Sequence, residues 1–236
     1  MDEDLHALIT PEQVGEFEKS QAARNAICLL GQLSGAHCME ISQANYTLIR
    51  DFLLVEVSID NASRAGALAK MTMEELNSAI KHDDEYIVHV CDQKTFATHG
   101  PAWIVLSSKL HSWVNIFVRQ ARSKVVGFAA NPKGTVFLTW FGEQMESSQI
   151  NKAIKSVWKK AKVDGNPSST ILHKSAVSQV QTVTSSGEAS ENLADLIARN
   201  VQTATKYYRL QEKSKSFVEA SKQLHTVMRG LDQTAR

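Results

Sequence analysis

The chain has 236 residues, which is enough for one large domain or two small ones with a substantial apolar core. Its share of hydrophobic residues (43%) is ordinary for a soluble globular protein, and no apolar run approaches the roughly 18 residues of a membrane span. The formal net charge of +1 excludes a strongly basic protein, so contacts with nucleic acid would have to come from local clusters of positive charge.

Three cysteines, Cys28, Cys38 and Cys91, are widely spaced and form neither a C-x-x-C pair nor a Cys/His zinc pattern. Such an odd and scattered set is typical of a reducing compartment. The acidic start of the chain has no apolar stretch of the secretory kind, so we expect a nuclear or cytoplasmic protein with no membrane contact. The histidines are scattered as well, and we expect no metal and no other cofactor.

The first part of the chain is expected to be helical. A cap-like Thr10-Pro11-Glu12 and a broad apolar face predict a helix over residues 11–33. A second apolar pattern predicts a helix over residues 42–60. Turn formers between Asp60 and Gly66 end this helix and surround one arginine, Arg64.

A small sheet is expected next. Thr72-Met73-Glu74-Glu75 reads as a capping box that opens a short helix through Ile80. Residues with high β propensity then predict three short strands, at 86–90, 95–98 and 103–106. Lys94 lies in the polar turn after the first of these strands. We therefore expect an antiparallel sheet of two or three strands.

The rest of the chain is expected to be mainly helical, which makes the whole an α/β (α+β) protein, mostly helical with a small sheet. Helical spacing of apolar residues predicts four further helices, over residues 109–122, 147–162, 170–183 and 191–198. A polar and basic helix follows Tyr207-Tyr208 and continues to the end. The four tryptophans are expected in the core: Trp103, Trp113, Trp140 and Trp158.

Two basic stretches leave alternatives open. The helix over 147–162 carries five lysines, which form either a solvated face or a surface for DNA phosphates: Lys152, Lys155, Lys159, Lys160 and Lys162. The net basic segment after Arg199 is either a loosely packed tail or a helix that docks on a neighbouring protomer.

The order of these elements resembles the catalytic domain of the tyrosine recombinases, the lambda-integrase-type family. Within it, the chain looks most similar to the DIRS- and Crypton-like recombinases of eukaryotic mobile elements. The resemblance covers about residues 45 to 212 and rests on short motifs taken together in order. It implies an N-terminal helical segment over 1–41 as a remnant of the core-binding domain, a catalytic domain over 42–212, and a basic helix or tail over 213–236.

Two motifs of the family have direct counterparts here. In the family, an arginine follows an early helix, in a turn that leads into another helix, and Arg64 matches this place. A lysine of the family lies in a turn of the small sheet, and Lys94 matches it. By resemblance, Arg64 would hold the scissile phosphate and Lys94 would protonate the leaving oxygen.

The remaining motifs match with two departures. The family's His-x-x-Arg helix start corresponds to Thr170-Ile171-Leu172-His173, so His173 stands where the family has its second arginine. The family places a histidine or tryptophan nine residues before the nucleophilic tyrosine. Counting back nine from Tyr208 reaches Arg199, and this spacing favours Tyr208 over Tyr207.

The resemblance implies a protein that binds double-stranded DNA and that breaks and rejoins strands through a 3′-phosphotyrosine link, without metal or ATP. Because His173 and Arg199 replace the expected residues, we expect impaired or lost catalysis. The DNA-binding lysines would be Lys152, Lys155, Lys159, Lys160 and Lys174.

Two other functions stay open at this point: a domesticated fold that holds DNA without cutting it, and a helical protein-interaction module. The C-terminal helix would support a homo-oligomer on DNA.

Overall fold

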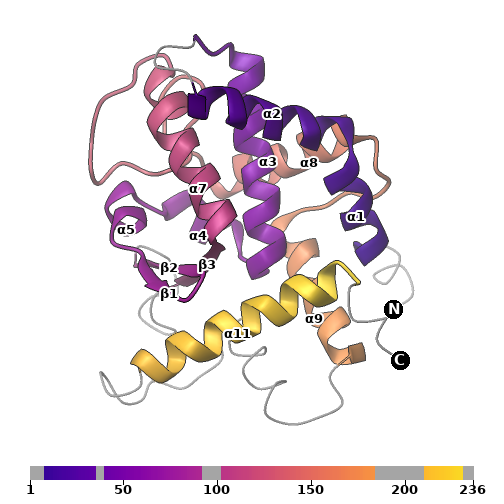
Figure 1. Ribbon diagram of the computed structural model, residues 1–236. Coiled ribbons are helices and arrows are strands. Elements are labelled where there is room, and N and C mark those ends of the chain that lie inside the picture. Colours follow the sequence, from indigo (N-terminus) through magenta and orange to yellow (C-terminus); the bar gives the residue numbers. More distant parts are fainter. Residues whose placement is uncertain (1–7, 36–39, 92–101, 184–209, 231–236) are drawn as a thin grey trace.

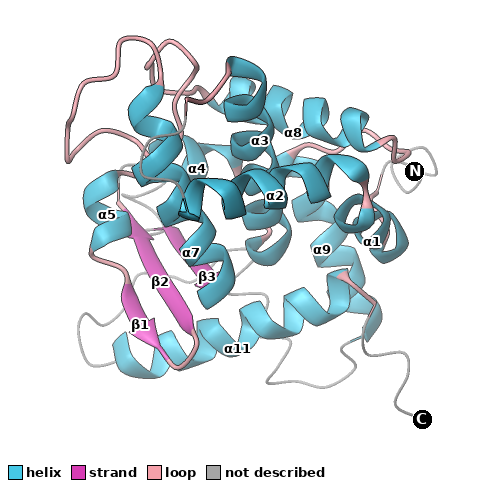
Figure 2. Ribbon diagram, turned by 45° about the horizontal axis from the view of Figure 1, so that its top comes forward, coloured by secondary structure: helices cyan, strands magenta, loops and turns pink. Residues whose placement is uncertain are grey.

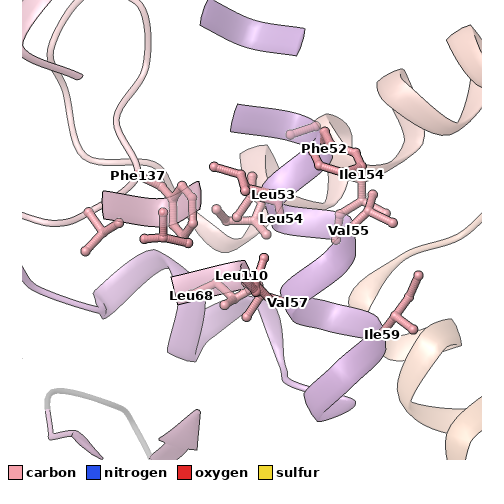
Figure 3. Close-up of a cluster of buried hydrophobic side chains, with 14 of the residues drawn as sticks. Phe52, Leu53, Leu54, Val55, Val57, Ile59, Leu68, Leu110, Phe137 and Ile154 are labelled. Carbon is pink, nitrogen blue, oxygen red and sulfur yellow. The ribbon is translucent and has the colours of Figure 1, made fainter. Parts of the chain in front are cut away.

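The computed structural model describes residues 8–35, 40–91, 102–183 and 210–230, whose arrangement is drawn in Figure 1. Helix α3 (Gln43–Asn61) runs through the middle of the molecule. Every residue from Ile49 to Asn61 is buried, because other helices pack on several sides of α3. Figure 3 shows Phe52 and Val55 of this helix in the core near Ile154. The helix predicted over residues 42–60 is thus confirmed.

Two helices, α1 (Pro11–Lys19) and α2 (Gln21–Gly35), replace the single helix predicted over residues 11–33. The predicted cap is present, since the Thr10 hydroxyl accepts a hydrogen bond from the Gln13 amide. The break falls at Ser20, whose hydroxyl accepts a hydrogen bond from the Ala23 amide and so caps the start of α2. Both helices bury apolar residues in the same core as α3.

A three-stranded antiparallel sheet, clearest in Figure 2, lies beside the C-terminal end of α3. The strands are β1 (Ile80–His82), β2 (Glu85–Val90) and β3 (Ala102–Ser107), in that order across the sheet. Two of the predicted strands are confirmed as β2 and β3. The predicted strand 95–98 lies outside the described residues.

The short helix predicted from Thr72 through Ile80 is partly wrong. Its capping box is present and opens α5 (Met73–Asn77), but Ile80 already belongs to strand β1. A two-residue turn at Asp83 and Asp84 joins β1 to β2, since His82 pairs with Glu85. The apolar Ile80 continued the helical pattern in sequence, although in the structure it pairs with Ile87 across the sheet.

The helix predicted over residues 109–122 is confirmed, although its hydrogen bonding changes along its length. It begins as α7 (Ser108–Ile116) and continues as a π-helical turn over Phe117–Ala121. A 3-10 turn at Arg122–Lys124 ends it, where Arg122 is buried and its guanidinium donates two hydrogen bonds to the Thr135 carbonyl.

The remaining helices are α8 (Ser147–Ala161), α9 (Ser169–Val183) and α11 (Leu210–Met228). They confirm the helices predicted over 147–162 and 170–183 and the described part of the C-terminal helix, whereas 191–198 lies outside the described residues. Of the four tryptophans, only Trp158 is fully buried, and the other three are half-buried. The predicted fold class, mostly helical α+β with a small antiparallel sheet, is confirmed.

Candidate functional site

The turn that carries Arg64 is held in place by the end of α3. Ala62 adopts the left-handed conformation, with φ 46°, and Arg64 then begins α4 (Ala65–Lys70) with its side chain exposed. Asn61 ties this turn to strand β3, because its amide nitrogen donates to the Val105 carbonyl at 2.9 Å and its oxygen accepts from the Val105 amide at 2.7 Å. Helix, turn and sheet are therefore fixed to one another directly before Arg64.

His173, on the second turn of α9, contacts the same turn. Its Nδ1 atom lies 3.0 Å from the carbonyl oxygen of Ala62, a residue 111 positions earlier. A carbonyl oxygen can only accept, so this hydrogen bond places a proton on Nδ1. The half-buried imidazole therefore has Nε2 as its remaining polar atom. The fold thus brings together the neighbourhoods of two predicted site residues, Arg64 and His173.

The start of α8 lies at the same place. The Ser147 hydroxyl lies 3.8 Å from the position that a Cβ atom on Gly66 would occupy, next to Arg64. Further along α8, the Asn151 side chain accepts a hydrogen bond from the Ser169 amide at 2.9 Å, where α9 begins. The first turn of α4 and the starts of α8 and α9 therefore meet around the Arg64 turn.

The predicted DNA-binding lysines are exposed on the two helices that start at this place. Four of them lie on α8 and one on α9: Lys152, Lys155, Lys159, Lys160 and Lys174. The apolar residues of α8, including Ile154 and Trp158, face the core, which leaves the lysine-bearing side to solvent. The name basic face is used below for the set of these five exposed lysines and Arg64.

A pocket of about 330 Å³ lies between α3 and α8, and Lys152 and Lys160 are among its lining residues. Arg50 and Asp51 form a buried ion pair in it, with 2.7 Å between guanidinium and carboxylate. Burial raises the pKa of Asp51, an effect that the neighbouring Arg50 opposes. This pocket is lined by residues of the N-terminal half of α3, and neither Arg64 nor His173 contributes to it.

Three predicted catalytic residues, Lys94, Arg199 and Tyr208, lie outside the described residues. Lys94 belongs in sequence to the connection between Val90, where β2 ends, and Ala102, where β3 begins. These two end residues pair with each other across the sheet.

A group of buried charged side chains was not predicted from the sequence. Arg229, the residue directly after α11, contacts three carboxylates, Glu18, Glu56 and Asp60, from α1 and α3. A usable signal was present, since Glu56 and Asp60 interrupt an otherwise apolar stretch of α3 at a spacing of one helical turn. Charged residues at buried positions of a helix need partners, and these partners come from distant parts of the chain.

Within residues 8–35, 40–91, 102–183 and 210–230, no three His, Cys, Asp or Glu side chains are grouped so that they could hold a metal ion. None of the helices in these ranges is long and apolar enough to cross a membrane.

Comparison with solved structures identifies the fold of this chain. The chain has a tyrosine recombinase fold, with the small antiparallel sheet and surrounding helices of the catalytic domain. One solved structure that supports this is the XerH site-specific recombinase bound to palindromic difH substrate in a post-cleavage complex. It superposes with a TM-score of 0.52 and 12% sequence identity, over 93% of this chain and 51% of that chain.

A pre-cleavage complex of XerH with difH gives a TM-score of 0.49 and 11% identity, over 88% of this chain and 53% of that chain. This chain thus spans about half of the length of that recombinase. No family model matches the sequence, and no curated protein matches it.

Proposed function

We propose that this chain binds double-stranded DNA on its basic face and derives from a tyrosine recombinase. The observation that carries the proposal is the hydrogen bond between His173 and the Ala62 carbonyl. This hydrogen bond joins the turn that carries Arg64 to helix α9, which carries His173. In a tyrosine recombinase, these two motifs would have to lie around the same phosphate. The exposed lysines of α8 and α9 would contribute sequence-independent contacts with phosphates.

Strand cleavage by such a site would use Tyr208 as the nucleophile. Its phenolic oxygen would form a bond to the phosphorus, and the bond from phosphorus to the 5′ oxygen would break. Lys94 would give a proton to that leaving oxygen, and Arg64 would hold the non-bridging oxygens of the phosphate. The reverse displacement rejoins a strand, because the energy of the broken bond is kept in the phosphotyrosine link.

We further propose that catalysis is impaired at His173 and Arg199. An arginine at position 173 could present two parallel N–H donors to a phosphate, whereas an imidazole presents at most one on the side away from its backbone contact. In His173 the Nδ1 proton is already used by the Ala62 carbonyl, so Nε2 can donate to a phosphate only when both ring nitrogens carry protons. Removal of one preorganised donor typically costs about 10²–10³ in rate. Arg199 would approach from a different direction and would restore only part of the charge.

The same observation favours a second candidate function, namely a DNA-binding module without strand cleavage. A histidine whose polar atom holds the Arg64 turn contributes to the fold whether or not a phosphate is cleaved. In that case the exposed Arg64 and the lysines of α8 would act as phosphate contacts only.

Other parts of the proposal rest on the resemblance alone. The ancestor would belong to the DIRS- or Crypton-like mobile elements, because the histidine that opens His-x-x-Arg is Thr170 here and this position varies more in that branch. The protein would act in the nucleus, where its DNA partner is. Residues 1–41 would be the remnant of a core-binding domain, 42–212 the catalytic domain, and 213–236 the segment through which copies associate on DNA.

Covalent trapping tests the catalytic part of this proposal. The full chain is incubated with nicked duplexes of random sequence, and protein–DNA adducts that survive denaturant are counted. We expect a low yield that the pair His173→Arg and Arg199→His increases, that Tyr208→Phe abolishes, and that the matched control Tyr207→Phe leaves unchanged. If neither the chain nor its double variant gives an adduct, the strand-transfer reading is wrong.

Retention on DNA at increasing salt tests the binding part. We expect the logarithm of the association constant to fall linearly with the logarithm of salt concentration, as neutralised phosphates release counterions. Binding without adducts would select the non-cleaving module. Absence of binding at about 50 mM salt, or binding that ignores salt, would select a protein-interaction module instead.

A further inference from the structure

Helix α11 is held on the rest of the molecule by one arginine among three carboxylates. Arg229 donates from Nε to Glu18 at 2.5 Å, from Nη1 to Asp60 at 2.8 Å and from Nη2 to Glu56 at 3.5 Å. These contacts join α11 to α1 and to α3. Figure 1 shows α11 along one side of the molecule, from the sheet to the end of α9.

Apolar contacts accompany this ion cluster. Leu224 and Met228 of α11 are fully buried in the main core, and Val218 packs with Ile87 and Val105 of the sheet. The Ser221 hydroxyl also donates to the Asp60 carbonyl at 3.4 Å. The helix therefore docks through a continuous surface in which Arg229 supplies the charged contacts.

The cluster contains more negative than positive charge. Glu18, Glu56 and Asp60 face the single guanidinium of Arg229, and the side chains of Glu56, Asp60 and Arg229 are only 9–10% exposed. Glu56 Oε1 is buried without a hydrogen-bond partner among the described residues. Because buried unpaired charge is costly, the docked arrangement favours the uptake of protons.

His225 adds a hydrogen bond to the cluster. Its Nδ1 atom lies 3.1 Å from Asp60 Oδ1 and 2.9 Å from Arg229 Nη1. These two contacts cannot both be hydrogen bonds, since Nδ1 either carries a proton for the carboxylate or offers a lone pair to the guanidinium. With three carboxylates around a single guanidinium, we assign the proton to Nδ1, where it is donated to Asp60.

Glu56 is the place for such a proton. Burial, and to a lesser degree the charges of Asp60 and Glu18, raise the pKa of Glu56 to about 8 against the opposing effect of Arg229. Asp60 behaves differently: burial raises its pKa, but hydrogen bonds and charge from His225 and Arg229 outweigh this and lower it overall. Asp60 therefore stays ionised while Glu56 holds a proton at neutral pH.

Charged groups on other elements also act on the cluster. Lys109 on α7 attracts the charge of Glu56 and so favours its ionised form. Glu85 on β2 and the neighbouring Asp84 add further negative charge near the cluster. The positive charge of Lys222 on α11 partly offsets it. Burial and the charge of Asp60 raise the pKa of Glu85 as well, so the acidic excess extends beyond the contacts of Arg229.

We propose that Glu18, Glu56, Asp60, His225 and Arg229 form a proton-dependent latch, which holds α11 on its own chain and loosens as protons leave the cluster. The sign follows from Glu56. Its docked pKa of about 8 lies above the ordinary value of 4.5, which the carboxyl group would approach once undocking exposes it to water, so docking takes up a proton between these pH values. Docking is therefore strongest at acidic pH and weakens as pH rises towards 8, by at most about tenfold per pH unit for one proton.

Hydrogen exchange of the α11 amides tests the latch in the full chain without DNA, so its failure is distinct from failure of the DNA-binding proposal. Protection factors of residues 224–228, corrected for the intrinsic pH dependence of exchange, are measured from pH 5.5 to 9. We expect protection to fall several-fold to tenfold per pH unit up to about 8 and then to level off.

Variants distinguish the effect of the Glu56 proton from a general loss of α11 docking. Glu56→Gln keeps an acceptor for Arg229 without charge, so its protection should stay flat with pH, while the exposed control Glu219→Gln on α11 should follow the wild type. Arg229→Lys should lose protection at every pH, because one ammonium cannot contact Glu18, Glu56 and Asp60 together. The ¹³C shift of the Glu56 carboxyl group gives an independent titration. A flat wild-type profile, an unchanged slope in Glu56→Gln, or ordinary titration of Glu56 would each overturn the proposal.

Discussion

Two regions of this molecule use arginine and histidine in opposite ways. In the cluster at α11, Arg229 is 9% exposed and contacts Glu18, Glu56 and Asp60, so its charge is fully occupied inside the protein. At the basic face, Arg64 is exposed at the start of α4, and His173 holds only the backbone of the turn before it. The first region fixes a helix, whereas the second leaves positive charge available for a ligand.

This difference separates stability from binding. A buried charge is retained only with partners, and loss of one partner leaves the others uncompensated. An exposed charge contributes little to stability, but it adds to affinity for a negatively charged polymer. Substitutions in the two regions should therefore change different measured quantities, and the following predictions start with the largest effect.

Arg229→Ala should have the largest effect on stability. It leaves Glu18, Glu56 and Asp60 without the guanidinium between them, and we expect the docked state of α11 to lose about 3–5 kcal/mol. Hydrogen exchange of the α11 amides at fixed pH measures this loss. If the docked state of α11 loses less than about 1 kcal/mol in this variant, Arg229 does not stabilise the fold more than an exposed arginine does.

Asn61→Ala should come next, because Asn61 joins the Arg64 turn to the sheet. The substitution leaves the amide and the carbonyl of Val105 without their side-chain partners in a buried place. An unsatisfied group costs about 1–3 kcal/mol; at about 1–2 kcal/mol for each of the two groups, we expect a total of roughly 2–4 kcal/mol in the free energy of unfolding. Denaturant unfolding measures it, and Asn77→Ala, at an exposed asparagine, serves as the control.

His173→Ala should have a smaller effect. It removes a single hydrogen bond at 3.0 Å to the Ala62 carbonyl, which is worth about 1 kcal/mol. Denaturant unfolding checks this magnitude. A loss well above 3 kcal/mol would place His173 among the residues that hold the core rather than beside the proposed phosphate site.

Arg64→Ala should have the smallest effect on stability, within about 0.5 kcal/mol, because the side chain is exposed. The same variant should bind DNA more weakly, with a salt dependence that is lower by roughly one phosphate contact. Unfolding and DNA-binding measurements on one preparation check both parts. A large change in the free energy of unfolding together with unchanged DNA binding would mean that Arg64 stabilises the fold and does not contact DNA.

Much of the fold could be predicted because its signals are local. The hydroxyls of Thr10 and Thr72 each accept a hydrogen bond from the backbone amide three residues later. Four residues of sequence are therefore enough to encode this capping geometry. The strands β2 and β3 were visible as short runs of residues with high β propensity. The break at Ser20 was missed because apolar residues on both sides continue the same helical pattern, although the serine itself was a capping signal.

The candidate site was only partly predictable. The order of the motifs indicated Arg64 and His173 as site residues. The contact between their surroundings depends on the hydrogen bond from His173 to the Ala62 carbonyl, two residues far apart in sequence. The charged cluster depends on packing of α11 against α1 and α3, which no local pattern encodes. Glu56 and Asp60 stand out in the sequence because they interrupt an apolar stretch of α3, but the sequence does not show which residues pair with them. The predicted roles of Lys94, Arg199 and Tyr208 stay predictions.

The measurement that tests the account most directly is the effect of charge reversal on DNA affinity. Lys155→Glu with Lys159→Glu alters the basic face, and Lys124→Glu with Lys133→Glu makes the same charge change at two exposed lysines elsewhere. At about 0.1 M salt we predict a loss of at least about tenfold for the first pair, with a lower salt dependence, and less than about threefold for the second. Equal losses for the two pairs, or no loss for the first, would contradict the assignment of the basic face.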